Sequence, residues 1–295
     1  NLKSLLKETL NIEGREINTD DMALLTELYG EGKNISDLTG LEYAVNLVTL
    51  SLYQNQISRL NPLSDLRKIS YLHLNENSIT DIQPLSGITS LRTLLLADNP
   101  ITDISPLENL NRLSNLSLAN NQITDISAIS SLDSLSRVDL SYNQINDISA
   151  LSDKFQLSEL SLYENQVSDL SPLSMNMALV KLNLDYNRFI NDLSPLRDLS
   201  QMENLRLSVN QITDISYLSR MTGLKSLGLS DNLIEDISPL SGMNELTYLS
   251  MGGNNISDGT VFNQLTQLNY LILYKNALSN VDFLSDLTNL VYCEI

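Results

Sequence analysis

Leu113-Ser-Asn-Leu-Ser-Leu-Ala-Asn-Asn121-Gln-Ile123 is the stretch of the chain that decides the fold. From Asn115 to Ala119, polar and apolar residues alternate, which is the period of a β-strand with one buried face. We predict that Leu116 and Leu118 point inward and that the residues beside them point to the opposite face. Asn121 follows where the chain must turn. A buried amide there can both donate hydrogen bonds to the turn backbone and accept them from it.

The same pattern, LxxLxLxxNxI, recurs along almost the whole chain. Its asparagine is found at Asn55, Asn77, Asn99, Asn121, Asn143, Asn165, Asn187, Asn210, Asn232, Asn254 and Asn276. Every step is 22 residues except that from Asn187 to Asn210, which is 23. The extra residue lies in "NRFINDL" (Asn187 to Leu193), where we predict a tolerated bulge in a surface loop. An earlier unit, Gly32 to Leu41, matches in phase with Lys33 in the asparagine slot.

The residues after the asparagine predict the far side of each coil. Asp-Ile-Ser-Pro-Leu occurs at 103–107 and 236–240, and close variants occur in other repeats. Serine before proline is typical of a helical N-cap with proline at the first helical position. Too few residues remain before the next strand for a longer helix, so we predict a short 3₁₀ turn.

A single repeat is too small to fold alone. It offers about seven large apolar side chains, each contributing about 1.5–3 kcal/mol when buried, whereas ordering each of its 22 residues costs about 1–2 kcal/mol. Stacked repeats share one continuous core, and their strands pair in parallel about 4.8 Å apart. We therefore predict an α/β-type leucine-rich-repeat solenoid, with a parallel sheet on the concave side and 3₁₀ turns on the convex side.

Residues 1–31 do not follow the repeat, and we predict a helical N-terminal cap there. The solenoid would then cover residues 32–295 in about twelve units. One helix is predicted over Asn1–Leu10 and a second from Asp20 to Tyr29, with Thr19 as its N-cap. The apolar positions behind these helices are Leu2, Leu5, Leu6 and Leu10, and then Met22, Leu24, Leu25 and Leu28. The last unit is truncated, with Cys293 and Ile295 in its two buried slots, so the natural protein is expected to continue.

Composition argues against several classes of partner. A net charge of −18 disfavours nucleic acid, whose binding depends on Lys and Arg, and disfavours an anionic membrane surface. The single cysteine, Cys293, excludes a disulfide framework and a cysteine-rich zinc site. No apolar run approaches the ~18–20 residues that a membrane span needs, so we expect no direct membrane insertion of this segment.

The repeat unit NxITDISPLSxLxxLxxLxL resembles that of the internalins, leucine-rich-repeat surface proteins of Gram-positive bacteria. The entry segment, "INTDDMALLTELYGEGKNI" followed by "LTGLEYAVNLVTLSLYQNQI", is similar to an internalin-type cap. The resemblance covers nearly the whole chain. It implies secretion, attachment to the bacterial cell wall and, in some members, adhesion to host receptors in virulence. An immunoglobulin-like module and an anchoring signal often follow the repeats in this family.

Catalysis has little support in the sequence. His73 is the only histidine, so a Ser/His/Asp or Cys/His pair would have to use it. It occupies an outward strand slot, and the chain has neither a nucleophile elbow nor a Gly-rich phosphate loop. We expect a surface or contact role for His73, no catalytic residue and no cofactor.

One aspartate recurs in each repeat after the turn. The column comprises Asp81, Asp103, Asp125, Asp147, Asp169, Asp192, Asp214, Asp236 and Asp258. Stacked carboxylates can in principle collect Ca²⁺, but a calcium site concentrates several oxygen ligands in one loop, and these loops offer one carboxylate each. We favour the alternative that each aspartate caps its own turn backbone, and predict no metal site.

The outward strand positions are the predicted binding surface. In LxxLxLxxN, the third, fifth, seventh and eighth residues are predicted to face away from the core, and tyrosines concentrate there. The main predicted partner-binding group is Tyr248, Tyr270 and Tyr292 in one column, with Ile272 and Tyr274 beside them. A second group is Tyr142, Tyr163 and Tyr186, and a third is Tyr53 and Tyr71. Tyrosine is enriched in protein interfaces, although cross-strand tyrosine ladders also serve stability alone.

The leading functional hypothesis is a secreted or cell-wall-attached bacterial binding protein. Its expected partner is a protein ligand such as a host cell-surface receptor, bound on the concave face. The alternative is an intracellular leucine-rich-repeat scaffold or phosphatase-regulator-type adaptor, which also uses 22-residue repeats. An enzyme is a distant third. The identity of the ligand does not follow from the fold.

Overall fold

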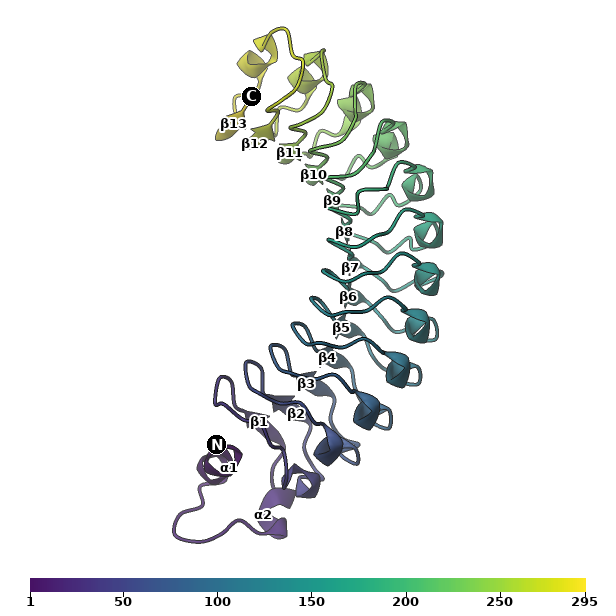
Figure 1. Cartoon of the computed structure of the whole chain (residues 1–295). Helices are drawn as coiled ribbons and strands as arrows, with labels where there is room; N and C mark the ends of the chain where they lie inside the picture. The colour runs from purple at the N-terminus through teal and green to yellow at the C-terminus, as the bar shows by residue number, and fades with distance from the viewer. The chain divides into compact units, whose positions relative to one another are not determined.

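The computed structural model describes residues 1–295, which form two compact units, Asn1–Gln144 and Ile145–Ile295. Each unit repeats one coil: a three-residue strand, a turn, a 3₁₀ helix on the far side and a return to the next strand (Figure 1). This is the predicted leucine-rich-repeat solenoid. Two short α-helices, α1 (Leu2–Thr9) and α2 (Thr19–Ala23), precede the first strand.

Thirteen strands carry the sheet. In the first unit they are β1 (Glu27–Tyr29), β2 (Thr49–Ser51), β3 (Tyr71–His73), β4 (Thr93–Leu95), β5 (Asn115–Ser117) and β6 (Arg137–Asp139). In the second unit they are β7 (Glu159–Ser161), β8 (Lys181–Asn183), β9 (Asn204–Arg206), β10 (Ser226–Gly228), β11 (Tyr248–Ser250), β12 (Tyr270–Ile272) and β13 (Tyr292–Glu294). Within each unit, strands pair in parallel with their chain neighbours, so equivalent repeat positions become cross-strand neighbours.

The opposite side of each coil carries a 3₁₀ helix. In the first unit these are η1 (Leu41–Tyr43), η2 (Asn61–Leu63), η3 (Gln83–Leu85), η4 (Ser105–Leu107) and η5 (Ser127–Ile129). In the second unit they are η6 (Ser149–Leu151), η7 (Ser171–Leu173), η8 (Ser194–Leu196), η9 (Ser216–Arg220), η10 (Ser238–Gly242), η11 (Thr260–Gln264) and η12 (Asp282–Asp286). Both the predicted strands and the predicted 3₁₀ turns are therefore present.

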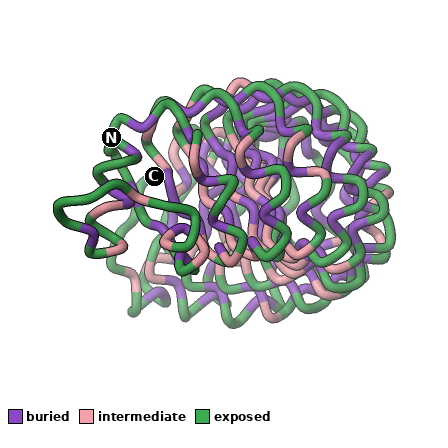
Figure 2. The backbone as a smooth tube through the Cα atoms, turned by 90° about the horizontal axis from the view of Figure 1, so that it is seen from below, coloured by how far each residue is buried: buried purple, intermediate pink, exposed green.

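The core lies between the strands and the 3₁₀ helices, where buried and exposed stretches alternate along every coil (Figure 2). Leu116, Leu118 and Ile123 of the motif quoted above are all fully buried. Their counterparts in other coils stack on them, so the apolar side chains form a continuous column that no single repeat can provide. Asn176 and Lys154 are also buried: the Asn176 side chain donates to the Leu151 carbonyl and accepts from the backbone N–H of Lys154.

A ladder of buried asparagines joins successive coils, as the pattern predicted. Nδ2 of Asn121 donates to the carbonyls of Leu96, Leu118 and Ala119 at 3.1, 2.9 and 3.1 Å. Its Oδ1 accepts from the backbone N–H of Ile101 at 3.0 Å. Leu96 and Ile101 belong to the preceding coil, so each amide is bonded both to its own turn and to the coil before it.

The extra residue after Asn187 interrupts this ladder. Oδ1 of Asn210 is buried and has no hydrogen-bond partner, although its Nδ2 still donates to the carbonyls of Leu184, Leu207 and Ser208. In the other coils, this oxygen accepts from a backbone N–H of the preceding coil. The longer turn moves that N–H away from Oδ1 of Asn210. The bulge itself contains Arg188 in the left-handed region, at φ 68°, and an exposed Phe189.

The aspartate column caps the 3₁₀ turns, which confirms the structural interpretation of that column. Oδ1 of Asp103 accepts from the backbone N–H of Ser105 at 2.8 Å, and the same bond recurs along the column. The prediction that serine is the N-cap was wrong. Ser105 is the first residue of η4, and the cap oxygen comes from the aspartate two residues earlier.

At the N-terminus, α1 packs against the first coil. Leu5 of α1 occupies the space beside Gly30, where a Cβ would lie 2.4 Å from its Cδ2 atom. Gly30 stands where later coils place their second strand leucine, so a side chain from the helix replaces one from the repeat. The Asn1 side chain donates to the Asn34 carbonyl at 2.6 Å.

The predicted second helix is shorter than expected. α2 ends at Ala23, and residues Glu27–Tyr29 are strand β1 instead. Leu25 and Leu28 are buried as the opening leucines of a repeat, while Leu24 is 75% exposed. The N-cap is Asn18 rather than Thr19: its side chain accepts from the Asp21 N–H, and Asp21 accepts in return. The division into a cap of residues 1–31 and a solenoid from residue 32 stays a prediction, and β1 lies within that first segment.

At the other end, Cys293 and Ile295 are exposed, not buried as their slots predicted, because β13 is an edge strand of the sheet that residues 1–295 form. None of the helices is both long enough and apolar enough to cross a lipid bilayer.

Candidate binding surface on the strand side

The strand-side surface is formed by the outward positions of the short strands. In β12, Leu271 is fully buried while Tyr270 on one side of it is 46% exposed, as the alternation predicted. The fifth and seventh positions depart from the prediction where their residues are small. Ser250, Ser141 and Ser230 are buried.

The eighth position also differs from a simple outward slot. Its residues adopt a left-handed backbone, including Tyr142 at φ 54°, Tyr186 at φ 61° and Val209 at φ 58°. Asparagine, aspartate and glycine tolerate this conformation best, and a β-branched valine there is rare. Tyr142 and Tyr186 therefore project from the turn that follows the strand, rather than from the strand itself.

The main tyrosine group forms a true column. Tyr248, Tyr270 and Tyr292 are direct cross-strand partners on β11, β12 and β13. Their ring centroids are 6.3 and 6.2 Å apart, and the rings are tilted by 37° and 33°. Tyr270 and Tyr292 are each nearly half exposed. The rings thus support one another and still present one face to a partner.

The Tyr274 side chain does not project outward beside this column but extends over the preceding coils. Its ring covers Gly252, where a Cβ would come within 2.4 Å of the ring carbon Cε1. The hydroxyl donates to Asp231 at 3.4 Å, two coils away. Burial, reinforced by the charge of Asp231, raises the pKa of the Tyr274 hydroxyl. Ile272, between the two tyrosine positions, is partly buried.

The second predicted group is only partly gathered within one unit. Tyr163 and Tyr186 have ring centroids 5.3 Å apart with a tilt of 58°. Tyr142 belongs to the first unit and is 48% exposed.

The third group is larger than predicted, because His73 joins it. The His73 ring stacks on Tyr53 with centroids 4.6 Å apart and meets the edge of Tyr71 at 6.5 Å. Tyr29 on β1, which was not among the predicted residues, is 60% exposed on the same sheet side. The four aromatic rings follow β1 to β3 and the turn after β2.

His73 also lies near a serine. Ser51 Oγ and His73 Nδ1 are 3.4 Å apart, and burial lowers the pKa of the histidine. In a hydrolase triad a carboxylate holds the other ring nitrogen, but no carboxylate hydrogen-bonds to this ring in the structure. The contacts of His73 are those of a stacked aromatic residue.

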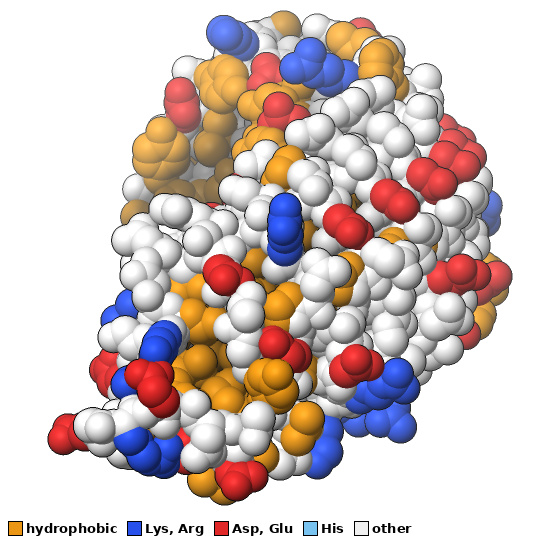
Figure 3. All heavy atoms as spheres, turned by 60° about the horizontal axis from the view of Figure 1, so that its bottom comes forward, with side chains coloured by type: hydrophobic (Ala, Val, Ile, Leu, Met, Phe, Trp, Pro, Cys, Tyr) orange, Lys and Arg blue, Asp and Glu red, His pale blue; other side chains and the backbone are white.

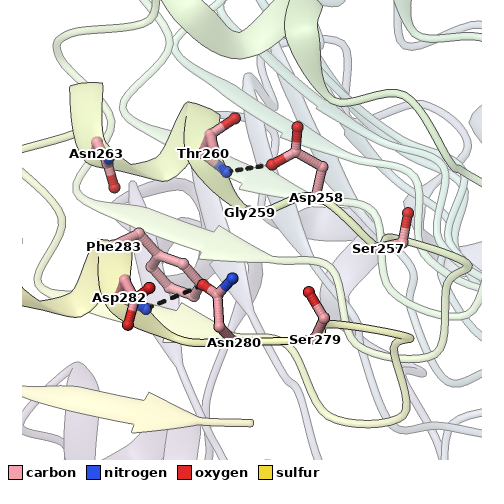
Figure 4. A pocket seen from close by; sticks show the side chains of 9 residues that line it. All are labelled: Ser257, Asp258, Gly259, Thr260, Asn263, Ser279, Asn280, Asp282 and Phe283. Carbon is pink, nitrogen blue, oxygen red and sulfur yellow. Dashed lines mark hydrogen bonds between the residues drawn. The ribbon is translucent and has the colours of Figure 1, made fainter.

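On the far side, a polar recess of about 240 Å³ lies between η11 and η12. Asp258 and Asn280 line it, and each accepts from a backbone N–H of its own turn, at 2.9 and 3.3 Å (Figure 4). No group of three or more His, Cys, Asp or Glu side chains converges as metal ligands would. On the face that Figure 3 shows, acidic side chains are scattered among the white atoms of uncharged polar side chains and backbone.

Sequence reasoning missed Arg206 on β9. Its guanidinium carbon lies 4.6 Å from the centroid of the Tyr248 ring, so it borders the tyrosine column. The alignment of the repeats contained a signal, because Arg206 and Gly228 occupy the same position in successive repeats and are cross-strand partners. A long side chain beside a glycine can cover that glycine. Counting tyrosines alone does not reveal that pair. The predicted binding residues themselves remain a prediction.

Comparison with known proteins follows from this architecture. The family model of leucine-rich repeats in pairs matches residues 45–87, 89–128, 111–153, 200–242 and 222–258, which together cover more than half of the chain. No curated protein sequence matches the chain.

Similar solved structures include three proteins of Listeria monocytogenes. The internalin InlF is 32% identical with a TM-score of 0.87, covering 100% of this chain and 94% of its own. Internalin C2 is 31% identical with a TM-score of 0.61, covering 78% of this chain and 92% of its own. The functional domain of InlJ is 25% identical with a TM-score of 0.85, covering 99% of this chain and 64% of its own. InlJ includes a cysteine ladder, whereas this chain has one cysteine. The chain belongs to the leucine-rich-repeat family and, within it, is an internalin-like protein.

Proposed function

We propose that this chain is a secreted or surface-displayed bacterial binding protein that recognises a host protein through the strand side of its second unit. The family membership supports binding as the role, because leucine-rich-repeat solenoids present a broad, rigid sheet to their partners. The observation that carries the proposal is the exposed column Tyr248, Tyr270 and Tyr292. Attachment to the cell wall is part of the proposal.

The column has the properties of an interface hot spot. Aromatic rings bury much area at small entropic cost, and these three are held by mutual contact before any partner arrives. Beside the rings, Gly228 and Gly252 carry no side chain, and Arg206 and Tyr274 cover them. The proposed role is binding without catalysis.

Flow cytometry of the fluorescently labelled chain on mammalian epithelial cells tests this function. We expect saturable binding that disappears when the cells are first treated with protease. Tyr270→Ser should weaken binding about thirtyfold, because a hot-spot tyrosine contributes about 2 kcal/mol or more. The same substitution should reduce stability by no more than about 1 kcal/mol, the value of a cross-strand pair.

Tyr217→Ser is the matched control, because Tyr217 is a partly exposed tyrosine on η9, on the 3₁₀ side of the same unit. Its binding should equal that of the wild type. If Tyr270→Ser is folded and binds cells as the wild type does, the tyrosine column is not the site. If protease treatment leaves binding intact, the partner is not a protein.

The alternative role as an intracellular scaffold has no specific observation in its favour. The similar structures named above are internalins, which supports the extracellular assignment within this proposal.

A further inference from the structure

Arg206 is an unusual cation on the strand side of the second unit. It is partly buried, and its guanidinium stacks on the Tyr248 ring with Cζ 4.6 Å from the centroid. Stacking on an aromatic face fixes the plane of a guanidinium and leaves its edge free to form hydrogen bonds. The Arg206 guanidinium is thus positioned by stacking on the Tyr248 ring rather than by hydrogen bonds from its N–H groups.

A glycine opposite Arg206 makes this position possible. Gly228 is its cross-strand partner on β10, and a Cβ at residue 228 would lie 3.0 Å from Cδ and 3.5 Å from Nη1 of Arg206. The same Cβ would lie 3.3 Å from the hydroxyl of Ser208. The arginine and the serine hydroxyl therefore converge on the space that the missing side chain leaves open.

The donors of Arg206 have no protein acceptor. Two lysines near the strands of this unit are paired: Lys181 with Glu159 at 3.0 Å, and Lys225 with Glu203 at 2.9 Å. No residue of the chain accepts a hydrogen bond from the guanidinium of Arg206.

Asp185, the carboxylate on which the charge of Arg206 acts, is already hydrogen-bonded. Asp185 accepts from the backbone N–H of Ser208 at 2.5 Å, and it makes no ion pair with Arg206. Burial raises the pKa of Asp185, although the Ser208 hydrogen bond and the charge of Arg206 oppose that rise. Arg206 keeps a planar fork of N–H groups that suits an acceptor with two oxygens.

We propose that Arg206, stacked on Tyr248 above Gly228, is the subsite for a carboxylate, namely an aspartate or glutamate side chain of the protein partner. This inference rests on the proposed function and adds a polar contact to the tyrosine column. The chain carries a net charge of −18, so the partner's wider surface is expected to be neutral or basic around that acidic residue.

The subsite is tested without the natural partner by NMR of arginine Nε–Hε groups. The Arg206 signal is identified by its loss in Arg206→Lys. The probes are glutamate blocked as N-acetyl and N-methylamide, the glutamine compound blocked in the same way, and blocked phosphoserine. We expect the glutamate probe to shift the Arg206 signal in a saturable way at millimolar concentrations, and the glutamine probe to leave it unchanged.

Gly228→Ala and Gly223→Ala are a matched pair of variants. The added methyl at residue 228 displaces Arg206, whereas a Cβ at Gly223 meets no atom within 4 Å. Gly228→Ala should weaken glutamate binding about tenfold, and Gly223→Ala should not change it. Equal binding by both variants, or an equal response to glutamine, overturns the carboxylate subsite. A preference for phosphoserine of tenfold or more replaces the carboxylate with a phosphate and also overturns it.

The cell assay separates this inference from the proposed function. Arg206→Met should weaken cell binding about tenfold while Tyr217→Ser does not. If Tyr270→Ser loses binding and Arg206→Met keeps it, the tyrosine surface stands and the subsite falls. If the glutamate probe binds at Arg206 but neither variant alters cell binding, the subsite stands and the proposed function falls.

Discussion

Asn232 and Asn210 occupy the ladder position of neighbouring coils, yet their replacement by alanine should have different costs. Nδ2 of Asn232 donates to the carbonyls of Leu207, Leu229 and Ser230, and its Oδ1 accepts from the Ile212 N–H at 3.0 Å. Nδ2 of Asn210 makes the equivalent three contacts, but its Oδ1 accepts nothing. The two sites therefore differ in one hydrogen bond, donated by a buried backbone group.

The carbonyls keep a partner in either alanine variant. Without Asn232, the Leu207 carbonyl still accepts from Asn210, the Leu229 carbonyl from Asn254, and the Ser230 carbonyl from the Val209 N–H. Without Asn210, the corresponding carbonyls still accept from Asn187, Asn232 and the Tyr186 N–H. Only Asn232→Ala leaves a buried donor without an acceptor, namely the backbone N–H of Ile212.

Each variant loses the two N–H donors of one side-chain amide, which three carbonyls share. The net cost is about 0.5–1.5 kcal/mol for each N–H, or about 1–3 kcal/mol in total. A buried N–H left without an acceptor costs about 1–3 kcal/mol more. We therefore expect Asn232→Ala to be less stable than Asn210→Ala by about 1–3 kcal/mol. Asn232→Asp should not restore stability, because its carboxylate cannot donate to the three carbonyls.

Urea unfolding followed by circular dichroism measures the difference, because the chain has no tryptophan to report by fluorescence. The midpoints and slopes of both variants must be compared, since a repeat array can lose two-state behaviour. Equal destabilisation, or a more stable Asn232→Ala, would mean that the Ile212 N–H finds another acceptor or that the extra residue does not set the cost at Asn210.

Two further predictions concern the aspartate column. Hydrogen bonds from the turn lower the pKa of Asp103, Asp147, Asp236 and Asp258 below the ordinary 3.8. A lowered folded-state pKa gives stability that is present above the unfolded pKa and lost as pH falls through the folded one, so the melting temperature should fall below about pH 4. A variant with these four aspartates changed to asparagine should show a shallower fall, and an unchanged pH profile would contradict the capping role. Millimolar Ca²⁺ should leave the melting temperature as it is in chelator, because each carboxylate is bonded to its own turn; a saturable rise would indicate a metal site.

Much of the fold follows from the 22-residue spacing. The strand phase, the inward leucines, the asparagine bonds and the tyrosine column all depend on one repeat position lying beside its equivalent in the next coil. That relation can be read from the alignment because parallel pairing in register turns spacing into contact.

The end of α2 could not be read in this way. Leu25 and Leu28 are three residues apart, which is the spacing of one helical face and also of the first two leucines in LxxLxL. Pairing of β1 with β2 decides between the two, and that is a tertiary contact.

Side-chain direction on the candidate site was equally hidden. Tyr274 can cover residue 252, and Arg206 can cover residue 228, because both residues are glycines. Each orientation depends on the size of a neighbour in another repeat. Examining only the tyrosines of the aligned repeats therefore does not predict these orientations.

The asparagine ladder gives the array a direction. Every hydrogen bond that the side-chain amide of a ladder asparagine makes outside its own turn joins it to the preceding coil. Asn121, for example, bonds to Leu96 and Ile101. A newly made coil can therefore complete its amide contacts as soon as the preceding coil exists, without waiting for the next. The repeat that begins at Gly32 has Lys33 where the later repeats have asparagine. The order in which a ribosome delivers the coils is the order in which their amides find partners.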